Sequence, residues 1–320
     1  MIEKLMEKLT LGISSCLLGN KVRYDGGHTL DHYVTETLGQ YFHWIPVCPE
    51  TESGLPVPRE AMRLTGSPAA PRLVTVRTGI DHTNGMLAWA SRKIPELEKE
   101  ELCGFIFKSK SPSSGMGGVK VYSDAGVPSK QGVGIFAKAF MSHFPLLPVI
   151  DDGRLHDPSL RENFIERVFV YRRWQKLMQA GATAGNLVAF HSRHKYLILA
   201  HSPKHYSALG KLVADVKKHP PQKLLAEYIR LLMEGLTLIA TAKKNTNVLL
   251  HMAGYFKHLL KPEEKNELLE IIEQYHQEFV PLIVPIVLLR HYVRQFQEPY
   301  LSSQYYLDPH PVELMLRNHA

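Results

Sequence analysis

The stretch that decides the fold is residues 12–19, GISSCLLG, which lead into Arg23, Asp25 and His28. A short apolar run here ends in a cysteine and a glycine turn, a pattern that predicts a strand followed by a polar loop. Residues 44–50, WIPVCPE, and residues 104–115, GFIFKSKSPSSG, repeat this order. Because loops at the carboxyl ends of parallel strands meet at one edge of a sheet, we expect one site built from three distant segments.

Short β-rich runs alternate with helical patterns over the first 150 residues. This alternation predicts βαβ units, an α/β class and a Rossmann-like, mostly parallel sheet. The expected strands are Leu9–Ser14, Phe42–Val47, Leu73–Val76, Gly104–Phe107 and Val119–Tyr122, and the expected helices lie near 29–41, 83–100 and 131–143.

Strand patterns almost disappear after residue 157, and helical periodicity takes over. We therefore predict two domains, an α/β domain at residues 1–157 and an all-α helical domain at residues 158–320. The expected helices of the second domain are 159–180, 183–201, 204–217, 221–242, 246–260, 263–280 and 282–297.

The composition is that of a globular protein with a basic surplus. The chain has 320 residues and a formal net charge of +7, and the region 161–258 concentrates this charge with sixteen Lys or Arg against five Asp or Glu. Such a surplus favours an anionic partner such as nucleic acid, although it also serves solubility.

The cysteines and the apolar runs indicate a reducing compartment. The three cysteines, Cys16, Cys48 and Cys103, show no disulfide framework, and residues 1–5 begin no apolar signal region. The longest apolar run, residues 279–289, contains two prolines and is too short to cross a bilayer. We expect a cytoplasmic protein with no membrane partner.

A cysteine that follows an apolar run is in general a small buried hydrophobic residue. Here Cys16 and Cys48 both end predicted strands, and turn and charged residues follow each of them. Three thiolates from three strands would hold three corners of an iron–sulfur cube and leave one iron open. Zinc uses similar ligands, but neither CxxC nor HxxxH spacing supports it.

Five motifs of the first half arrive in the order of a known family. They are residues 15–19 with 23–27 (SCLLG, RYDGG), residues 47–50 (VCPE), residues 54–59 (GLPVPR) and residues 111–115 (SPSSG), and together they resemble the thiouracil desulfidase (TudS) family. Residues 190–195, 200–206, 246–251, 254–257 and 281–285 resemble the YbgA-type helical domain. The fusion is similar to the RudS proteins, which implies sulfur removal from 4-thiouridine in tRNA, or from a free thiolated nucleobase.

The resemblance implies roles for individual residues. It implies a [4Fe-4S] cluster held by Cys16 and Cys48, with Glu50 and Ser111 as the proton-handling catalytic groups. The remaining residues of the motifs, expected at the substrate, are Arg23, Asp25, His28, Arg59, Ser113 and Ser114. By their own pattern, Arg23, Asp25 and His28 also fit a solvated turn, and Arg59 also fits a surface cation.

The third cluster ligand departs from the family pattern. The family has a cysteine where this chain has Ser114, so Cys103 substitutes as the ligand, the cluster is weakly held, or the activity is altered. If 104–108 is a strand, Cys103 begins it, about 15–20 Å from the turn. The alternative function is therefore a non-enzymatic RNA-binding or cluster-sensing protein.

The prediction of an RNA partner depends on residues of the helical half. His191, His194 and His201 fall on one helix face beside Arg193 and Lys195, with Lys204 close behind. This face fits a zinc site, a polar face with partly buried histidines, or a basic and aromatic surface for RNA. We expect Arg193, Lys195 and Lys204 to bind RNA.

Overall fold

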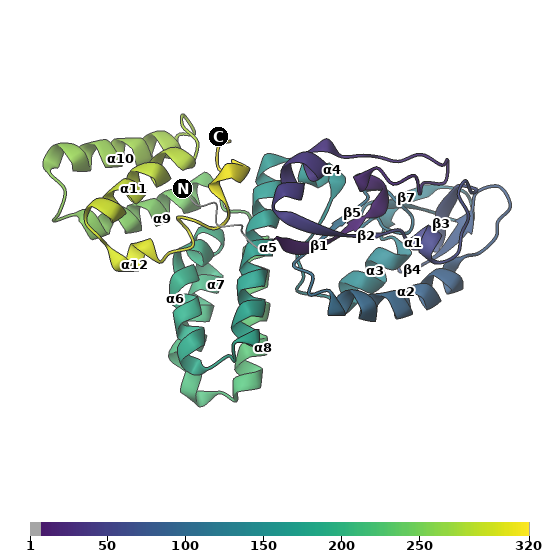
Figure 1. The fold of residues 1–320 in the computed structure, drawn as a ribbon, viewed down its shortest axis with the longest axis horizontal. Coiled ribbons are helices and arrows are strands. Elements are labelled where there is room, and N and C mark those ends of the chain that lie inside the picture. Colours follow the sequence, from purple (N-terminus) through teal and green to yellow (C-terminus); the bar gives the residue numbers. More distant parts are fainter. Residues whose placement is uncertain (1–7, 320) are drawn as a thin grey trace. The chain divides into compact units, whose positions relative to one another are not determined.

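The structure, a computed structural model, describes residues 8–319. The chain forms two compact units, Met1–Asp157 and Pro158–Ala320, which are described separately (Figure 1). The segment 1–5, considered above for a secretion signal, lies outside the described residues. Every helix between residues 8 and 319 is too short or too polar to span a membrane.

The first unit is organised around a sheet of four parallel strands. β1 pairs along its whole length with β2, from Leu9 opposite Phe42 to Ser14 opposite Val47, while β5 joins its other side. The strand order is β2 (Phe42–Val47), β1 (Leu9–Ser14), β5 (Phe105–Phe107) and β8 (Val149–Asp151). This sheet confirms the predicted α/β class with a mostly parallel sheet.

Aromatic side chains connect one helix to this sheet, and a second helix packs against the first. Helices α2 (Thr83–Lys99) and α3 (Ile135–His143) pack against each other, and the Phe140 ring of α3 lies 4.7 Å from that of Phe105. A Cβ atom on Gly12 would lie 2.3 Å from the Phe105 ring, so only glycine lets β5 pack against β1 here.

A second sheet, of mixed direction, was not foreseen. Leu73–Val76 and Val119–Tyr122 were expected in the parallel sheet, but the strands that contain most or all of these residues belong to this second one. Its order is β4 (Ala70–Thr75), β3 (Met62–Ser67), β6 (Val119–Tyr122) and β7 (Pro128–Gly132).

Short helical segments complete the first unit, and two of them, Tyr33–Thr37 and Leu38–Gln40, replace the single helix expected near residues 29–41. These segments are η1 (Ser15–Leu18), η2 (Tyr33–Thr37), η3 (Leu38–Gln40), α1 (Pro49–Glu52) and α4 (Asp152–Leu155).

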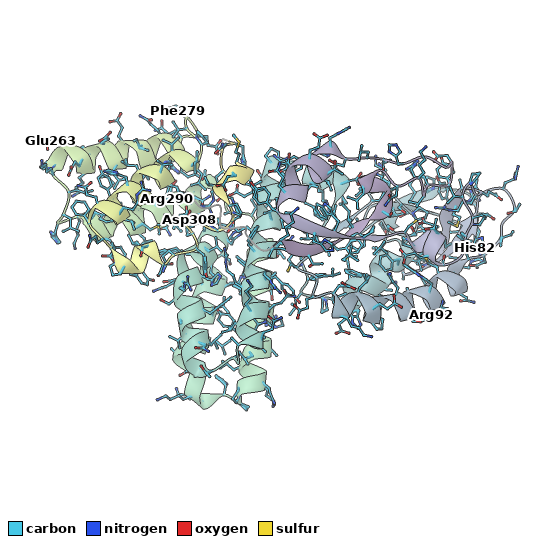
Figure 2. The ribbon with its side chains drawn as sticks, viewed as in Figure 1. His82, Arg92, Glu263, Phe279, Arg290 and Asp308 are labelled. Carbon is cyan, nitrogen blue, oxygen red and sulfur yellow. The ribbon has the colours of Figure 1, made fainter. Side chains whose placement is uncertain are left out.

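The second unit is all-α in its described residues, as predicted. Its core includes Trp174, whose ring stacks on that of Tyr228 at 5.6 Å, and Phe190, while Phe279 is exposed at the surface (Figure 2). Helix α9 begins earlier than predicted because the Thr241 side chain caps it by accepting the Lys244 amide. The helices are α5 (Pro158–Gln179), α6 (Ala184–His201), α7 (Pro203–Ala214), η4 (Val216–Lys218), α8 (Pro221–Thr237), α9 (Ala242–Ala253), η5 (Gly254–Phe256), α10 (Pro262–His276), α11 (Ile283–Gln295), α12 (Pro299–Ser302) and η6 (Val312–Leu314).

Candidate active site

A cavity of about 410 Å³ lies at the carboxyl edge of the parallel sheet, where β1, β2 and β5 end. All three segments singled out in the sequence contribute to its wall. The predicted site residues that line it are Cys16, Arg23, Cys48, Glu50, Arg59, Ser111 and Ser114.

Cys16 reaches the cavity because β1 turns sharply at its end. The turn closes at Gly19, whose φ of 88° is accessible to glycine and whose N–H donates to the Cys16 carbonyl at 3.3 Å. The Ser14 hydroxyl accepts the Lys108 amide at 2.8 Å, which ties the end of β1 to the segment after β5. The backbone therefore fixes Cys16 relative to the serine-rich turn.

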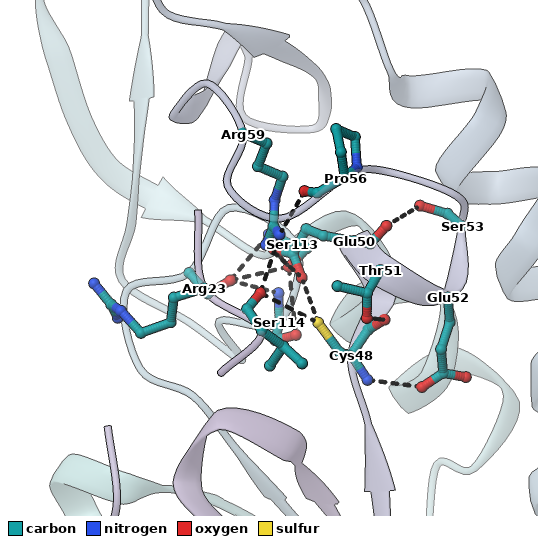
Figure 3. Close-up of polar contacts among 12 residues, drawn as sticks. Arg23, Cys48, Glu50, Thr51, Glu52, Ser53, Pro56, Arg59, Ser113 and Ser114 are labelled. Atoms are coloured by element: carbon teal, nitrogen blue, oxygen red, sulfur yellow. Dashed lines mark hydrogen bonds and ion pairs between the residues drawn. The ribbon is translucent and has the colours of Figure 1, made fainter. Parts of the chain in front are cut away.

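Glu50 is the centre of the polar contacts in the cavity (Figure 3). Ser113 donates its hydroxyl to Glu50 Oε1 at 2.6 Å, and the Cys48 thiol lies 3.5 Å from Oε2. The Arg59 guanidinium lies 3.8 Å from the same Oε2 and donates to the Val22 carbonyl at 3.0 Å. Because the side chains of Glu50 and Arg59 are only 13% and 8% exposed, the carboxylate keeps a defined position.

The serine-rich turn is held by the start of helix α3. The Gly134 amide donates to the Gly115 carbonyl at 2.8 Å, and the Ala137 amide donates to the Ser113 carbonyl at 3.1 Å. A Cβ on Gly134 would lie 2.5 Å from the Ser113 carbonyl group, so glycine permits this close approach. The hydroxyls of Ser111 and Ser113 lie 3.0 Å apart, which links Ser111 to the contacts of Glu50.

The environment of the two thiols opposes their ionisation. Burial raises the pKa of the Cys16 thiol, although Thr29 and Lys108 act in the opposite direction. Burial also raises the pKa of Cys48, and the nearby Glu50 carboxylate raises it further. A bound metal would favour the thiolates, because thiols lose their protons when they coordinate.

Lys108 is a cavity residue that sequence reasoning missed. Its ammonium group contacts Asp152 Oδ2 at 2.6 Å, and the Ser109 amide donates to Asp152 Oδ1 at 2.6 Å. Burial alone would raise the pKa of Asp152, but these two partners together lower it. The only sequence signal was a lysine directly after a buried strand, since Asp152 lies 44 residues further along the chain.

Four predicted residues are absent from the cavity wall: Ser113, whose hydroxyl still donates to Glu50, and Cys103, Asp25 and His28. Cys103 is 1% exposed and donates its amide to the Thr10 carbonyl, near the start of β1, whereas the cavity lies beyond Ser14 at its end. Asp25 and His28 are exposed residues of a turn, where Asp25 accepts the Gly27 amide at 3.0 Å. The contacts of Asp25 and His28 are those of a solvated turn.

The cavity wall contains two thiols, rather than three, that could hold a cluster. Cys16 and Cys48 line the wall, and Ser114, 4% exposed, supplies a hydroxyl oxygen at the third position. Within residues 8–319, no three side chains of His, Cys, Asp or Glu are grouped so as to hold a metal ion. The donor set therefore fits an iron–sulfur cluster at two of its three protein-held corners.

In the helical unit, the histidines make structural contacts. His194 lies 2.7 Å from the Phe190 carbonyl, and His201 contacts the Leu238 carbonyl at 2.6 Å and Glu166 at 3.1 Å. His191 contacts the Tyr228 hydroxyl at 3.2 Å, and burial, with Lys195, lowers its pKa to about 4. The face is therefore one of buried histidines with partners inside the unit.

The three predicted RNA-binding cations lie in different surroundings. Lys195 lines an open groove with Tyr206, Tyr255 and Tyr300. Arg193 packs over the ring of Tyr305 at 4.7 Å, and Lys204 is exposed at the start of α7. Of the three, only Lys195 combines with aromatic side chains around a groove.

The fold and this cavity define a class: an α/β unit of the thiouracil desulfurase type with a helical unit after it. Residues 11–152 match the family described as 2-thiouracil desulfurase, and residues 195–311 match a family described as a protein of unknown function (DUF1722). The chain belongs to the family that joins a 2-thiouracil desulfurase domain to a YbgA-type helical domain, which confirms the resemblance inferred from the motifs.

Similar proteins cover each part of the chain. The uncharacterized protein YbgA of Escherichia coli (strain K12) is 33% identical over 155 residues, which are 48% of this chain and 90% of that protein. The uncharacterized protein YbbK of Bacillus subtilis (strain 168) is 26% identical over 110 residues, 33% of this chain and 72% of that protein. A solved structure, the [4Fe-4S]-dependent thiouracil desulfidase TudS, shares 28% identity, with 46% of this chain and 93% of that chain covered and a TM-score of 0.39.

The raised pKa values predict slow alkylation of the two cavity thiols. At pH 7.5, iodoacetamide should modify Cys16 and Cys48 of the metal-free native protein more slowly than those of the unfolded protein, and the rates should rise with pH as thiolate forms. Glu50→Gln removes a charge that raises the pKa of Cys48, so Cys48 should then react faster. Peptide mass spectrometry measures each rate, and the buried Cys103 is the internal control. A native Cys48 that reacts faster than the unfolded one would contradict the prediction.

Proposed function

We propose that this protein removes sulfur from thiolated uracil, with 4-thiouridine in tRNA as the substrate, and releases uridine and hydrosulfide. The observation that carries the proposal is the single cavity in which two thiols and a fixed carboxylate, Cys16, Cys48 and Glu50, meet at the ends of two neighbouring strands. Membership of the 2-thiouracil desulfurase family supports the reaction class.

The reaction exchanges sulfur for oxygen without a change of oxidation state. Water adds its oxygen to the ring carbon that carries the sulfur, the carbon–sulfur bond breaks, and sulfur leaves as hydrosulfide while two protons are redistributed. Glu50 is placed to accept a proton from the attacking water, because Ser113 and Arg59 fix its orientation. Ser111 relays a proton through Ser113, 3.0 Å away.

Cys16 and Cys48, with the Ser114 hydroxyl as third donor, would hold the [4Fe-4S] cluster that the family resemblance implies. When bound, the cluster supplies an open iron as a Lewis acid for sulfur. The cations around the cavity, Arg23 and Lys108, balance the charge of thiolates and of hydrosulfide.

The helical unit is proposed to hold the tRNA. Its residues 161–258 carry the basic surplus of the chain, and the Lys195 groove offers three tyrosine side chains to unpaired bases. A base within folded RNA has to be unstacked before it reaches a cavity, which gives a separate RNA-holding unit a role.

Glu50→Gln tests the reaction itself. On anaerobically reconstituted protein, the substitution should lower kcat for hydrosulfide release from 2-thiouracil and from 4-thiouridine tRNA by about 10²–10⁴-fold, because the general base is lost. Iron content should stay unchanged. Glu100→Gln, an exposed acid in the same unit, is the matched control. A wild-type protein that retains iron but releases no hydrosulfide would favour the non-enzymatic alternative.

Iron retention tests the donor set. Cys16→Ser and Cys48→Ser should lose iron with an unchanged circular dichroism spectrum, and Ser114→Cys should raise iron content and oxygen stability, because thiolate is the better ligand. Cys103→Ser should leave iron content unchanged, since Cys103 does not line the cavity. Iron loss confined to Cys103→Ser would reverse this assignment.

The groove of the helical unit predicts unequal effects on tRNA binding. Lys195→Glu should weaken binding more than Arg193→Glu or Lys204→Glu, and should reduce the slope of log affinity against log salt by about 0.7–0.9, one phosphate contact. Lys265→Glu, an exposed lysine of α10, is the control. Filter binding of tRNA between low and physiological salt measures both. If all four substitutions have equally small effects on tRNA affinity, the helical unit does not recruit RNA.

A further inference from the structure

A cavity of about 320 Å³ lies within the helical unit, and no role has yet been given to it. Its wall is formed by α5, the end of α6, α9, α10 and the segment that follows α12. It shares none of its described lining residues with the Lys195 groove. A cavity of this size accommodates a small molecule. We call it the α5–α9–α10 cavity, after three of the helices that line it.

The buried charges of the α5–α9–α10 cavity are paired with one another. Arg317 Nε donates to Glu162 Oε1 at 3.1 Å. His201 has one ring nitrogen 2.6 Å from the Leu238 carbonyl and the other 3.1 Å from Glu166 Oε1. Burial alone would raise the pKa of Glu166, but His201 and Arg317 together hold it well below its usual range. Because carbonyl and carboxylate oxygens accept hydrogen bonds, both nitrogens of His201 carry hydrogens and the ring is a cation.

Glu278 is the acid of the wall that has no cationic partner. Glu162 and Glu166 contact Arg317, His201 and His319, whereas Glu278 forms no ion pair among residues 8–319. It is exposed directly after α10, where its amide donates to the Tyr275 carbonyl at 2.9 Å. The charge that remains uncompensated in the cavity wall is therefore negative, although residues 161–258 of the same unit carry the basic surplus of the chain.

Two buried side chains of the wall have hydrogen-bonding capacity that the described residues do not fill. Tyr275, 7% exposed, accepts Nδ2 of Asn245 at 3.1 Å, and its own hydroxyl hydrogen has no acceptor there. Burial raises the pKa of Tyr275 to about 12, so the hydroxyl keeps this hydrogen. Asn163, also 7% exposed, donates Nδ2 to the Leu236 carbonyl at 2.9 Å, while its Oδ1 accepts from none of residues 8–319. Because buried polar groups rarely lack partners, these two atoms indicate where a ligand binds.

We propose that the α5–α9–α10 cavity binds a small organic cation. Its ammonium or guanidinium group pairs with Glu278 and donates to Asn163 Oδ1, and a carbonyl or hydroxyl oxygen of the same molecule accepts from Tyr275. An anion does not fit, because the buried cations already have carboxylate partners. A metal ion does not fit either, since no three His, Cys, Asp or Glu side chains of residues 8–319 are grouped to hold one. The site lies outside the desulfidase cavity and does not depend on the proposed function.

Calorimetry on the full-length protein, free of RNA, tests the proposal with argininamide, agmatine and succinate as probes. Argininamide and agmatine share a guanidinium and an amino group, but only argininamide has a carbonyl oxygen that can accept from Tyr275. We expect argininamide to bind about threefold to tenfold more tightly than agmatine, which is the contribution of one hydrogen bond. Succinate, an anion of similar size, should not bind.

Three variants separate recognition of the ligand from damage to the fold. Tyr275→Phe keeps the ring and removes the hydroxyl, so the preference for argininamide over agmatine should disappear. Glu278→Gln should weaken both cations by about threefold to fivefold and leave their ratio unchanged. Glu263→Gln is the matched control, because it changes an exposed acid at the start of α10, whereas Glu278 follows the end of that helix (Figure 2 labels Glu263). It should change neither affinity.

The outcomes distinguish a built site from attraction by surface charge. A preference for argininamide that Tyr275→Phe removes, with weaker binding of both cations in Glu278→Gln, supports the site. The proposal is overturned if neither cation binds, if wild type binds argininamide and agmatine equally, or if succinate binds more tightly than both. Equal weakening by Glu263→Gln and Glu278→Gln also overturns it, because the cations then bind by charge alone. If circular dichroism shows that Tyr275→Phe does not fold, the two variants at exposed positions decide between these outcomes.

Discussion

Parallel pairing of β1 with β2 and β5 is the constraint on which the candidate site depends. Because these strands run in one direction, Cys16, Cys48 and the serine-rich turn all follow strand ends at the same edge. The pairing depends in turn on Gly12, since a Cβ there would meet the Phe105 ring at 2.3 Å. Gly12 thus allows β1 and β5 to lie close together, and this spacing determines how far Cys16 is from the serine-rich turn.

The charge of the cavity follows from the same arrangement. Glu50 is the only acid among the described lining residues, whereas Arg23, Arg59, Lys108 and Lys110 all line the wall. These cations oppose the effect of burial, which raises the pKa of both thiols, and a positive cavity favours bound anions. Arg59 and Ser113 keep Glu50 oriented within this field, so the one carboxylate is not free to pair with the other cations. In the reaction proposed above, the carboxylate that accepts the proton is therefore separate from the cations that hold anions.

The sequence predicted elements whose pattern is local and missed those that depend on distant partners. The bounds of β1, β2 and β6 were predicted to the residue, because each is a short apolar or alternating run. β7, Pro128–Gly132, has no apolar alternation and forms only through pairing with β6, so no local signal marks it. In the same way, the position of the Lys108 side chain depends on Asp152, 44 residues away, and was not predicted. The serine-rich turn was predicted because its composition alone is typical of a turn.

At the third donor position this chain has the oxygen of Ser114, whereas the family that its motifs resemble has the sulfur of a cysteine. Cys103 precedes β5 and lies beside Thr10, so no rotation of its side chain brings it to the far edge of the sheet. Ser114 already lies in the cavity wall, with its hydroxyl 3.4 Å from that of Ser113, the residue that donates to Glu50. Serine in place of a thiolate removes a negative charge two hydrogen-bond steps from Glu50. Because a serine oxygen is a weaker ligand for iron than a thiolate, in the site proposed above this difference would affect both the strength of cluster binding and the electrostatic surroundings of Glu50.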